Sequence, residues 1–292
     1  MNNPRFERNL GLLSSPEQDI LANSSVAIAG AGGDGGALAV QLARLGVGEL
    51  RLADPEIFEI ENMNRQATCT EDTLGTNKAV SVADYVRSIN PGMSVEVYED
   101  GITQDNTKRF VTGTDLVIDE TEYTMHELGV MLAREAREQD IPVETALNIG
   151  FGALVTTFRP DGKPLEEFLG LDTEQSIEEI AEQEVSLSRW LPYVPPYADL
   201  KVFENVASGE KSAPSVAPGV ALAAGLGATQ AMLNLVGRDN NRKSPVYAPK
   251  ALVVDAMTGR SKTVKFGRRS HYLHLLPLVA RNLLGRNPTA SY

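Results

Sequence analysis

The chain has 292 residues, of which 42% are hydrophobic and 23% charged, as in an ordinary globular protein. Its net charge of −12 disfavours non-specific nucleic-acid binding, because the phosphates would be repelled. The single cysteine, Cys69, excludes an internal disulfide and any zinc site with several cysteine ligands. The sequence shows neither a signal peptide nor the roughly 18 apolar residues of a membrane span. We therefore expect a cytoplasmic protein.

The first half of the chain alternates between expected strands and helices. After an amino-terminal arm (1–24) with a helix capped at Ser15, a strand at 25–30, a helix at 37–45 and a strand at 48–54 form a βαβ unit. Further strands are expected at 93–99, 115–120, 141–147 and 153–160, and helices at 77–89, 105–113 and 125–139. This alternation predicts an α/β fold, a Rossmann-like, mostly parallel sheet with helices on both faces.

The second half of the chain has a different character. A proline-containing crossing segment is expected at about 171–218, and its acidic start, 172–184, is expected to form a solvated face together with Glu166 and Glu167. Residues 220–236 are apolar nearly all round and predict a buried core helix.

The end of the chain predicts an extension of the sheet. Residues 250–267 read as an antiparallel hairpin that turns at 257–259. We expect residues 1–269 to form a single domain, followed by a basic tail at 270–292.

A glycine-rich turn joins the first strand to the first helix of the βαβ unit. Gly30, Gly32 and Gly35 follow the G-x-G-x-x-G pattern, and Gly33 adds a further glycine. Glycines let the backbone approach a phosphate or ribose closely, beside the positive end of a helix. Asp54 ends the second strand, where a carboxylate can accept hydrogen bonds from ribose hydroxyls. The pattern favours a nucleotide over a purely structural turn, and a solvated strand-end carboxylate remains the alternative for Asp54.

The loop that follows Asp54 is unusually long. Residues 54–77 join a strand to a helix, a connection that usually needs about two to six residues. Arg65 and Lys78 could both fold back over the glycine turn, and two extra cations suit a triphosphate whose charge must be neutralised while it is cleaved. Asn62 and Gln66 would hold the loop or the nucleotide by neutral hydrogen bonds.

These motifs together resemble the ThiF/MoeB family, the bacterial relatives of the ubiquitin-activating enzymes. The resemblance covers about residues 5–269 and rests on the glycine turn, Asp54, Asn62-x-x-Arg65-Gln66, Lys78 and Arg5-Phe6-x-Arg8. It implies a domain that binds ATP with magnesium and adenylates a carboxylate, often the C-terminus of a small ubiquitin-like protein, or a carboxylate of a peptide. It also implies a homodimer in which Arg8 reaches the partner's ATP site, and it adds Glu56 to the nucleotide-binding residues.

The sequence departs from the family pattern after the fourth strand. The family commonly has D-x-x-D-N there, and its second Asp works with magnesium; this chain has Asp119-Glu120-Thr121-Glu122-Tyr123. The resemblance thus places Glu122 at the magnesium, with Asp119 as a helper. The paired Cys-x-x-Cys zinc motifs and a cysteine in the crossing segment are missing, so we expect no zinc, a structural thiol at Cys69 and no thioester on the enzyme.

The implied chemistry is attack of a carboxylate on the α-phosphate of ATP, with Arg8, Arg65, Lys78 and Glu122 as the catalytic residues. Two alternatives stay open. A non-catalytic nucleotide-binding subunit would explain the altered run at 119–123. An NAD- or FAD-binding oxidoreductase would share the glycine turn but leave the cations unexplained.

Overall fold

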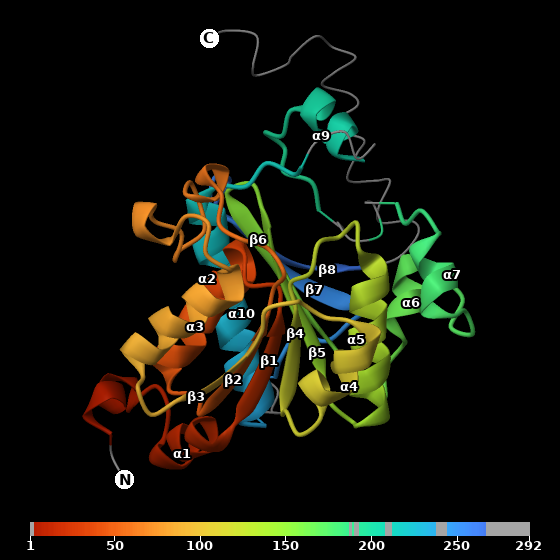
Figure 1. Ribbon diagram of the computed structural model, residues 1–292. Coiled ribbons are helices and arrows are strands. Elements are labelled where there is room, and N and C mark those ends of the chain that lie inside the picture. The colour runs from red at the N-terminus through yellow and green to blue at the C-terminus, as the bar shows by residue number, and fades with distance from the viewer. Residues whose placement is uncertain (1–2, 187–188, 190–192, 208–211, 238–243, 267–292) are drawn as a thin grey trace, which may run out of the picture.

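The computed structural model describes residues 3–186, 189, 193–207, 212–237 and 244–266. These residues form one eight-stranded sheet in the order β3-β2-β1-β4-β5-β6-β7-β8, with helices on both faces (Figure 1). Strands β1 to β5 run parallel, and β6, β7 and β8 continue the sheet antiparallel. The predicted Rossmann-like sheet and its antiparallel extension are confirmed. The basic tail at 270–292 lies outside the described residues.

The elements follow the predicted alternation. The strands are β1 (Ser25–Ala29), β2 (Glu49–Ala53), β3 (Ser94–Tyr98), β4 (Leu116–Asp119), β5 (Val143–Ile149), β6 (Gly152–Phe158), β7 (Lys250–Asp255) and β8 (Arg260–Lys265). The α-helices are α1 (Ser15–Asn23), α2 (Gly33–Leu45), α3 (Lys78–Ile89), α4 (Gln104–Val111), α5 (His126–Glu138), α6 (Leu165–Leu169), α7 (Ile177–Ala181), α9 (Leu200–Ala207) and α10 (Ala217–Leu235). Short 3-10 helices are η1 (Pro4–Asn9), η2 (Ile60–Asn62) and η3 (Glu71–Thr73).

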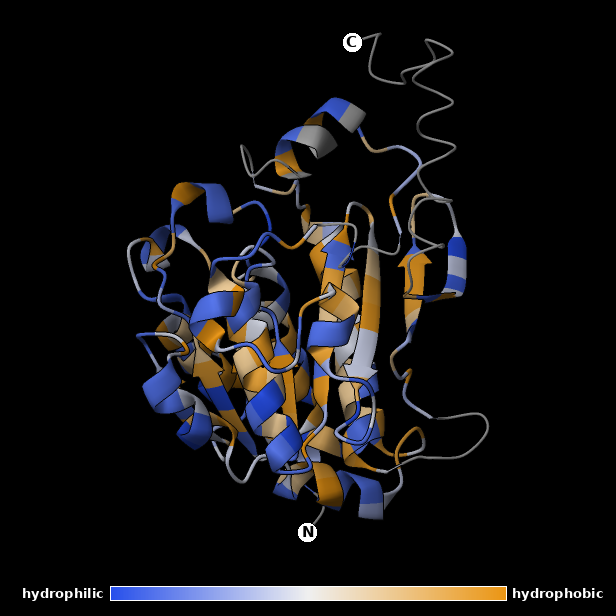
Figure 2. Ribbon diagram, turned by 90° about the vertical axis from the view of Figure 1, so that its right-hand side faces the viewer, coloured by the Kyte–Doolittle hydropathy of each residue, from blue (hydrophilic) through white to orange (hydrophobic). Residues whose placement is uncertain are grey.

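The core lies between the sheet and its two helical layers. All five residues of β1 are buried, as expected of a central parallel strand covered on both sides. Figure 2 shows apolar strands in the middle of the molecule and polar residues on the outer sides of the helices. One face of the sheet packs against α2, α3 and α10, and the other against α4 and α5. This burial fixes the strand order and therefore the place where the strand ends meet.

Helix α10 lies very close to the sheet. A Cβ atom at Gly227 would lie 2.6 Å from Leu38 Cδ1 and 2.8 Å from Ala146 Cβ, so only glycine allows this approach. The helix begins at Ala217, not at residue 220 as predicted, because Pro218 is well suited to a first turn that needs no N–H partner. Within the described residues no helix, α10 included, has the length and apolarity to cross a bilayer.

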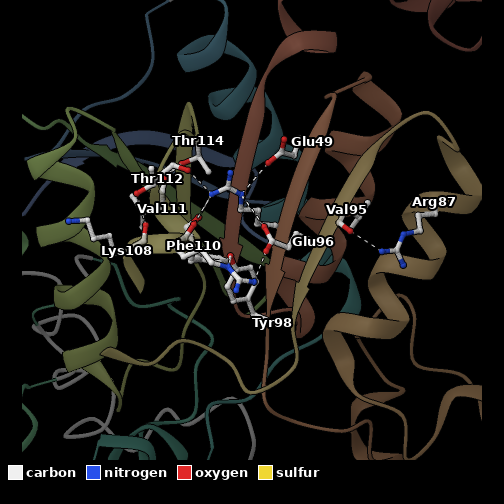
Figure 3. A network of polar contacts seen from close by, with 12 residues as sticks. Glu49, Arg87, Val95, Glu96, Tyr98, Lys108, Phe110, Val111, Thr112 and Thr114 are labelled. Atoms are coloured by element: carbon white, nitrogen blue, oxygen red, sulfur yellow. Dashed lines mark hydrogen bonds and ion pairs between the residues drawn. The ribbon is translucent and has the colours of Figure 1, made fainter. Parts of the chain in front are cut away.

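On the opposite face a single arginine completes the end of α4 (Figure 3). Arg51, from β2, donates through Nη1 to the carbonyl oxygens of Arg109 (2.9 Å), Phe110 (3.0 Å) and Thr112 (2.8 Å). The last carbonyls of a helix have no partner within it, and a cation there also suits the helix dipole. This network is satisfied within the chain and is structural.

Two helix starts near the amino terminus also differ from the predictions. The cap of α1 is Ser14, not Ser15: its N–H donates to Glu17 Oε2 at 2.7 Å, and its Oγ accepts from Glu17 N at 3.4 Å, which is a capping box. Helix α2 already begins at Gly33, not at residue 37. The glycines were interpreted as a loop because of their low helix propensity, but close packing overrides that propensity here.

The acids of the stretch 172–184 and Glu167 are exposed as predicted, and Glu166 is the exception. Within 172–184 only α7 is an α-helix, and it begins at a Ser176 cap. Glu166 is not on a solvated face: it is 3% exposed, and Arg134 Nε donates to its Oε1 at 2.7 Å. Arg134 also donates to the carbonyls of Gln175 and Thr173, so the buried pair ties this stretch to α5.

Candidate active site

Three strand ends lie side by side at one edge of the sheet. Ala29, the last residue of β1, pairs in register with Ala53 of β2 and with Asp119 of β4. The glycine turn and the loops after β2 and β4 therefore leave the sheet at the same level. The strand order also reverses between β1 and β4, and open α/β sheets bind ligands outside the carboxyl ends of the strands at such a switch point.

The glycines of the turn have two different roles. Gly30 has a φ of 95°, and a Cβ atom there would overlap the carbonyl oxygen of Glu120. A Cβ atom at Gly35 would overlap the carbonyl oxygen of Gly30, so both positions are required by packing. At Gly32 and Gly33 the nearest atoms are side-chain atoms at 3.5 and 3.4 Å, in ordinary contact. Both positions are half-buried and have room for a side chain, so packing within the chain does not require glycine there.

Asp54 ties the glycine turn to β2. Its Oδ2 accepts from Ala31 N at 2.7 Å and its Oδ1 from Glu56 N at 2.9 Å. The residue is 6% exposed, and burial raises the pKa of its carboxyl group. The carboxylate therefore orders the turn, and its predicted contact with a ribose stays a prediction.

The long loop 54–77 is a folded platform. Phe58 is 2% exposed and exchanges backbone hydrogen bonds with Thr76 and Gly75. Asn62 Oδ1 accepts from Glu59 N at 3.0 Å. Cys69 is 7% exposed, its thiol donates to the carbonyl of Glu59 at 3.7 Å, and burial raises the pKa of the thiol. The loop needs its length to build this small core, and the burial of Cys69 agrees with a structural role.

The loop and the start of α3 carry two cations in different states. Lys78 is 5% exposed, and its Nζ forms an ion pair with Glu56, whose side chain is 63% exposed. Arg65 is half-buried and donates through Nη1 to Glu61 O (3.0 Å) and Asn64 Oδ1 (2.9 Å). Among the described residues Arg65 forms no ion pair with a carboxylate. Its guanidinium therefore has charge to offer an anion.

Glu122, in the loop after β4, faces the same cations. Desolvation of its carboxyl group raises its pKa, and the carboxylates of Glu56 and Asp54 raise it further, while Lys78 and Arg65 oppose them. Opposing charges of this kind mark a functional cleft more often than a structural surface. A bound cation would relieve the repulsion among these three carboxylates.

Asp119, the predicted helper of Glu122, is occupied within the chain. Its Oδ1 accepts from Thr121 Oγ1 at 2.7 Å and from Thr121 N at 3.1 Å, and burial raises its pKa. In the part of the chain that the structure describes, no group of three or more His, Cys, Asp or Glu side chains could hold a metal ion. A magnesium ion would fit here as it usually does in nucleotide sites, on one or two carboxylates and the phosphates themselves.

Gln66 contributes an unused acceptor beside the turn. It is 6% exposed, and its amide group lies against Gly32, 3.5 Å from where a Cβ atom would be. Its Oε1 is buried and has no hydrogen-bond partner among the described residues. Buried polar atoms are nearly always paired, so this one suits a donor from a ligand.

Asp34 is a site residue that the sequence analysis missed. It sits in the first turn of α2, and its Oδ2 accepts from Asn148 N (3.0 Å) and Asn148 Nδ2 (2.7 Å). Burial raises the pKa of its carboxyl group to about 6, against the hydrogen bonds from Asn148 and the charge of Arg65, which lower it; the charge of Glu122 raises it further. The glycine pattern treats residue 34 as a spacer, and the one signal was an acid in the first turn of a helix.

Arg8 lies far from this site. It is exposed on η1, where Phe6 packs against Gly46 at the last turn of α2. The glycine turn is at the other end of α2, whose 13 residues span about 20 Å. Arg8 therefore does not join the other site residues of its own chain.

The family model described as "ThiF family" matches residues 6–274. The chain belongs to the ThiF family. The SAMP-activating enzyme E1 of Haloferax volcanii is 35% identical over 150 residues, which cover 50% of this chain and 53% of that protein. The adenylyltransferase and sulfurtransferase MOCS3 of Arabidopsis thaliana is 30% identical over 167 residues, 55% of this chain and 34% of that one. The chain thus spans about half the length, or less, of these curated relatives.

Solved structures agree on the fold of this ThiF-family chain. The structure of E. coli MccB with ATP matches with a TM-score of 0.66 at 21% identity, over 91% of this chain and 73% of that one. MccB with MccA-N7isoASN matches with a TM-score of 0.67 at the same identity and the same coverage of both chains. At this identity the likeness shows the fold alone.

The structure brings most of the predicted residues of this ThiF-family chain to one edge of the sheet. The predicted residues found there are Gly30, Gly32, Gly33, Gly35, Asp54, Glu56, Asn62, Arg65, Gln66, Lys78, Asp119 and Glu122. It does not bring Arg8 there. Their roles toward a ligand stay predictions.

Proposed function

We propose that the chain is an ATP- and magnesium-dependent adenylyltransferase that activates a carboxylate. The observation that carries this proposal is the grouping of two cations, Arg65 and Lys78, with the carboxylate of Glu122 at the strand ends that bear the glycine turn, where both cations lower the pKa of that carboxyl group. The names of the relatives support it: one is an activating enzyme and one an adenylyltransferase, and MccB was solved with ATP.

In this proposal the glycine turn seats the nucleotide, and Asp54, Asn62 and Gln66 hold the turn and the ligand. Lys78 would exchange Glu56 for a phosphate oxygen. That exchange costs little, because the Glu56 side chain is 63% exposed and water can take over its carboxylate. Arg65 needs no exchange, since it has no carboxylate partner among the described ion pairs.

The proposed reaction is a single displacement at phosphorus. A carboxylate oxygen of the substrate forms a bond to the α-phosphorus of ATP, and the bond from that phosphorus to the α–β bridging oxygen breaks. Pyrophosphate leaves with the electron pair, and an acyl-adenylate remains; no proton has to move. Arg65 and Lys78 would stabilise the growing negative charge. Glu122 would hold the magnesium ion, which neutralises phosphate charge when bound.

The acyl-adenylate would pass directly to an outside nucleophile. Cys69 is the one cysteine of the chain, and at 7% exposure its thiol cannot easily reach an acyl group. We propose that the substrate is a small ubiquitin-like protein or a peptide. The SAMP-activating relative and the MccB structure with MccA-N7isoASN support these two classes.

We further propose a homodimer that shares its sites. Arg8 lies at the far end of α2 from its own glycine turn, and nearby Leu12 is 84% exposed. The loop 54–77 exposes Ile57 (51%) and Ile60 (63%) among acidic residues. An arm with exposed arginines and a leucine would complement that acidic, apolar surface on a second copy.

Pyrophosphate exchange tests the reaction. Labelled pyrophosphate should enter ATP when the protein is mixed with magnesium and the correct carboxylate, and it should not do so without the carboxylate. Calorimetry with ATP and with NAD is the control for the nucleotide. Tight binding of NAD with no ATP signal would support the oxidoreductase alternative and contradict the proposed adenylyltransferase activity.

Subunit mixing tests the dimer. Arg8→Ala and Lys78→Ala proteins should each be inactive alone, and mixing them should restore activity, because one site of each mixed dimer then holds both residues. A fully active monomer would contradict the shared site, and a mixture without recovery would remove Arg8 from it.

A further inference from the structure

A continuous chain of hydrogen bonds joins Arg65 to Asp34. Arg65 Nη1 donates to Asn64 Oδ1 at 2.9 Å, and Asn64 Nδ2 donates to the carbonyl oxygen of Ser215 at 3.0 Å. Ser215 Oγ donates to Asn148 Oδ1 at 3.0 Å. Asn148 Nδ2 then donates to Asp34 Oδ2 at 2.7 Å. Every donor in this chain meets an acceptor, so its direction is defined from end to end.

This series of hydrogen bonds links four separate segments of the protein. Asn64 belongs to the loop 54–77, Asn148 to β5 and Asp34 to α2. Ser215 lies at the end of the crossing segment, two residues before α10 begins. It uses its side chain toward Asn148 and its backbone carbonyl toward Asn64, so it connects the loop 54–77 to β5.

The two ends of this series of hydrogen bonds, Arg65 and Asp34, distinguish it from the structural networks of the fold. Arg51 forms an ion pair with Glu49 and donates hydrogen bonds to carbonyl oxygens at the end of α4, so its charge is neutralised within the protein. Arg65 has no carboxylate partner among the described ion pairs, and Asp34 Oδ1 is buried without a partner in the same part of the chain. The Arg65 end thus keeps a charge that an anionic ligand could use, and the Asp34 end is held within the protein by Asn148.

We propose that Asn64, Ser215, Asn148 and Asp34, here called the relay, position Arg65 for a nucleotide phosphate. The relay rests on the proposed function in one respect, that the ligand of Arg65 is a nucleotide phosphate. Its four members are positioning residues, and Arg65 alone would touch the ligand.

The physical reason is preorganisation. An arginine side chain loses about 2 kcal/mol of rotamer freedom when it is held in place. Fixing Arg65 before the nucleotide arrives removes that cost from binding and aims the guanidinium at the growing charge. Because Ser215 bonds to both Asn64 and Asn148, the end of the crossing segment is part of this arrangement.

Binding of magnesium-ATP, measured by calorimetry, tests the relay without requiring turnover. Asn148→Ala removes two relay bonds and should weaken binding about fivefold or more, the effect of one neutral hydrogen bond or more. In an Arg65→Ala background the same substitution should change binding less than twofold, because the group that the relay positions is already gone. Gln104→Ala, which removes an exposed 2.7 Å bond to Glu178, is the control and should change nothing.

Reversing the central bond gives a rescue that a merely structural role would not predict. Asn148→Asp sets two carboxylates against each other and should weaken binding more than tenfold. Adding Asp34→Asn lets the new amide donate to the new carboxylate and should recover most of the loss. Adding Asp34→Ala instead restores the same net charge without the bond, and it should recover clearly less. Thermal unfolding of each variant checks that it is folded.

The outcomes separate the relay from the adenylation. If Asn148→Ala weakens binding equally with and without Arg65, or if both rescues work equally well, the relay is wrong. If the wild-type protein binds magnesium-ATP but exchanges no pyrophosphate with any carboxylate, the adenylation is wrong and the relay stands on its own results. A wild-type protein that binds no ATP would overturn both.

Discussion

The loops after β2 and β4 flank the same glycine turn but are built in opposite ways. Residues 54–77 enclose Phe58, which is 2% exposed, and bond to themselves along their length. The loop 120–125 is short and exposes Met125 at 44%, and the carboxyl group of its Glu122 interacts electrostatically with Lys78 and Arg65. The first loop is a rigid platform that carries cations, and the second offers a carboxylate with little structure behind it. The predicted nucleotide site would therefore lie between one loop with many internal hydrogen bonds and one loop with few.

The acids of the two loops show the same contrast. Asp54 accepts from two backbone N–H groups, whereas Glu122 forms no side-chain hydrogen bond that fixes it among the described residues. Substitutions of Phe58 and Asp54, which hold the first loop together, should therefore act on stability, and substitution of Glu122 in the second loop should act on activity. Five measurements can break or sharpen this contrast.

The largest effect should come from Phe58. Phe58→Ala removes a fully buried ring and should lower the free energy of unfolding by about 3–5 kcal/mol. Met125→Ala, in the exposed loop, is the matched control and should change it by about 0.5 kcal/mol or less. Urea denaturation measures both. Equal losses would show that the second loop is as much a platform as the first.

Asp54 and Glu122 form the next pair. Asp54→Ala leaves the N–H groups of Ala31 and Glu56 without acceptors and should cost about 2–4 kcal/mol of stability. Glu122→Ala should leave stability unchanged within about 0.5 kcal/mol but lower pyrophosphate exchange. A stable Asp54→Ala protein would contradict the role of that carboxylate in ordering the turn.

Asp34, between the two loops, predicts a pH dependence. Its pKa is raised from 3.8 to about 6, so the folded state resists its ionisation, and the wild-type protein loses stability as the pH rises from about 4 to 6. Asp34→Asn removes this loss and should be more stable by at most about 3 kcal/mol at pH 8, and by about half of that at pH 5. Urea midpoints at both pH values measure the difference. A gain that does not depend on pH would refute the raised pKa.

The cations should affect turnover and not folding. Lys78→Ala and Arg65→Ala should each lower turnover at least tenfold, or about 1.4 kcal/mol of transition-state stabilisation. Arg65→Ala should leave the melting temperature nearly unchanged, because it breaks no ion pair between described residues. Unchanged activity in both variants would count against phosphate contacts.

Cys69 should give the smallest effect. Because its thiol is buried in the platform, Cys69→Ser should retain activity, and no thioester should form. Mass spectrometry of the enzyme with its substrate is the direct check. A substrate adduct on Cys69 that reducing agents release would mean that the platform opens during catalysis.

Much of the fold and part of the site could be predicted from local sequence patterns. The βαβ unit, the glycine turn and the cations at 65 and 78 all follow from periodicity, glycine spacing and loop length. The burial of Glu166 could not be predicted, because two neighbouring acids in a sequence indicate a solvated surface. Only the structure shows that Arg134 donates a hydrogen bond to Glu166. The start of α2 was predicted too late, since helix propensity does not include the close packing of Gly35 against Gly30.

What the sequence by itself determined is the class of sheet, the nucleotide turn and the residue types gathered beside it, because each of these is written in short-range spacing. The tertiary structure decided which of those residues are already occupied: Asp54 by backbone donors, Lys78 by Glu56, and Arg65 by no carboxylate among the described ion pairs. It alone revealed Asp34 and its bonds to Asn148, which lies 114 positions away. Hydrogen bonds between distant segments depend on how the sheet and helices pack, and no local pattern encodes that packing.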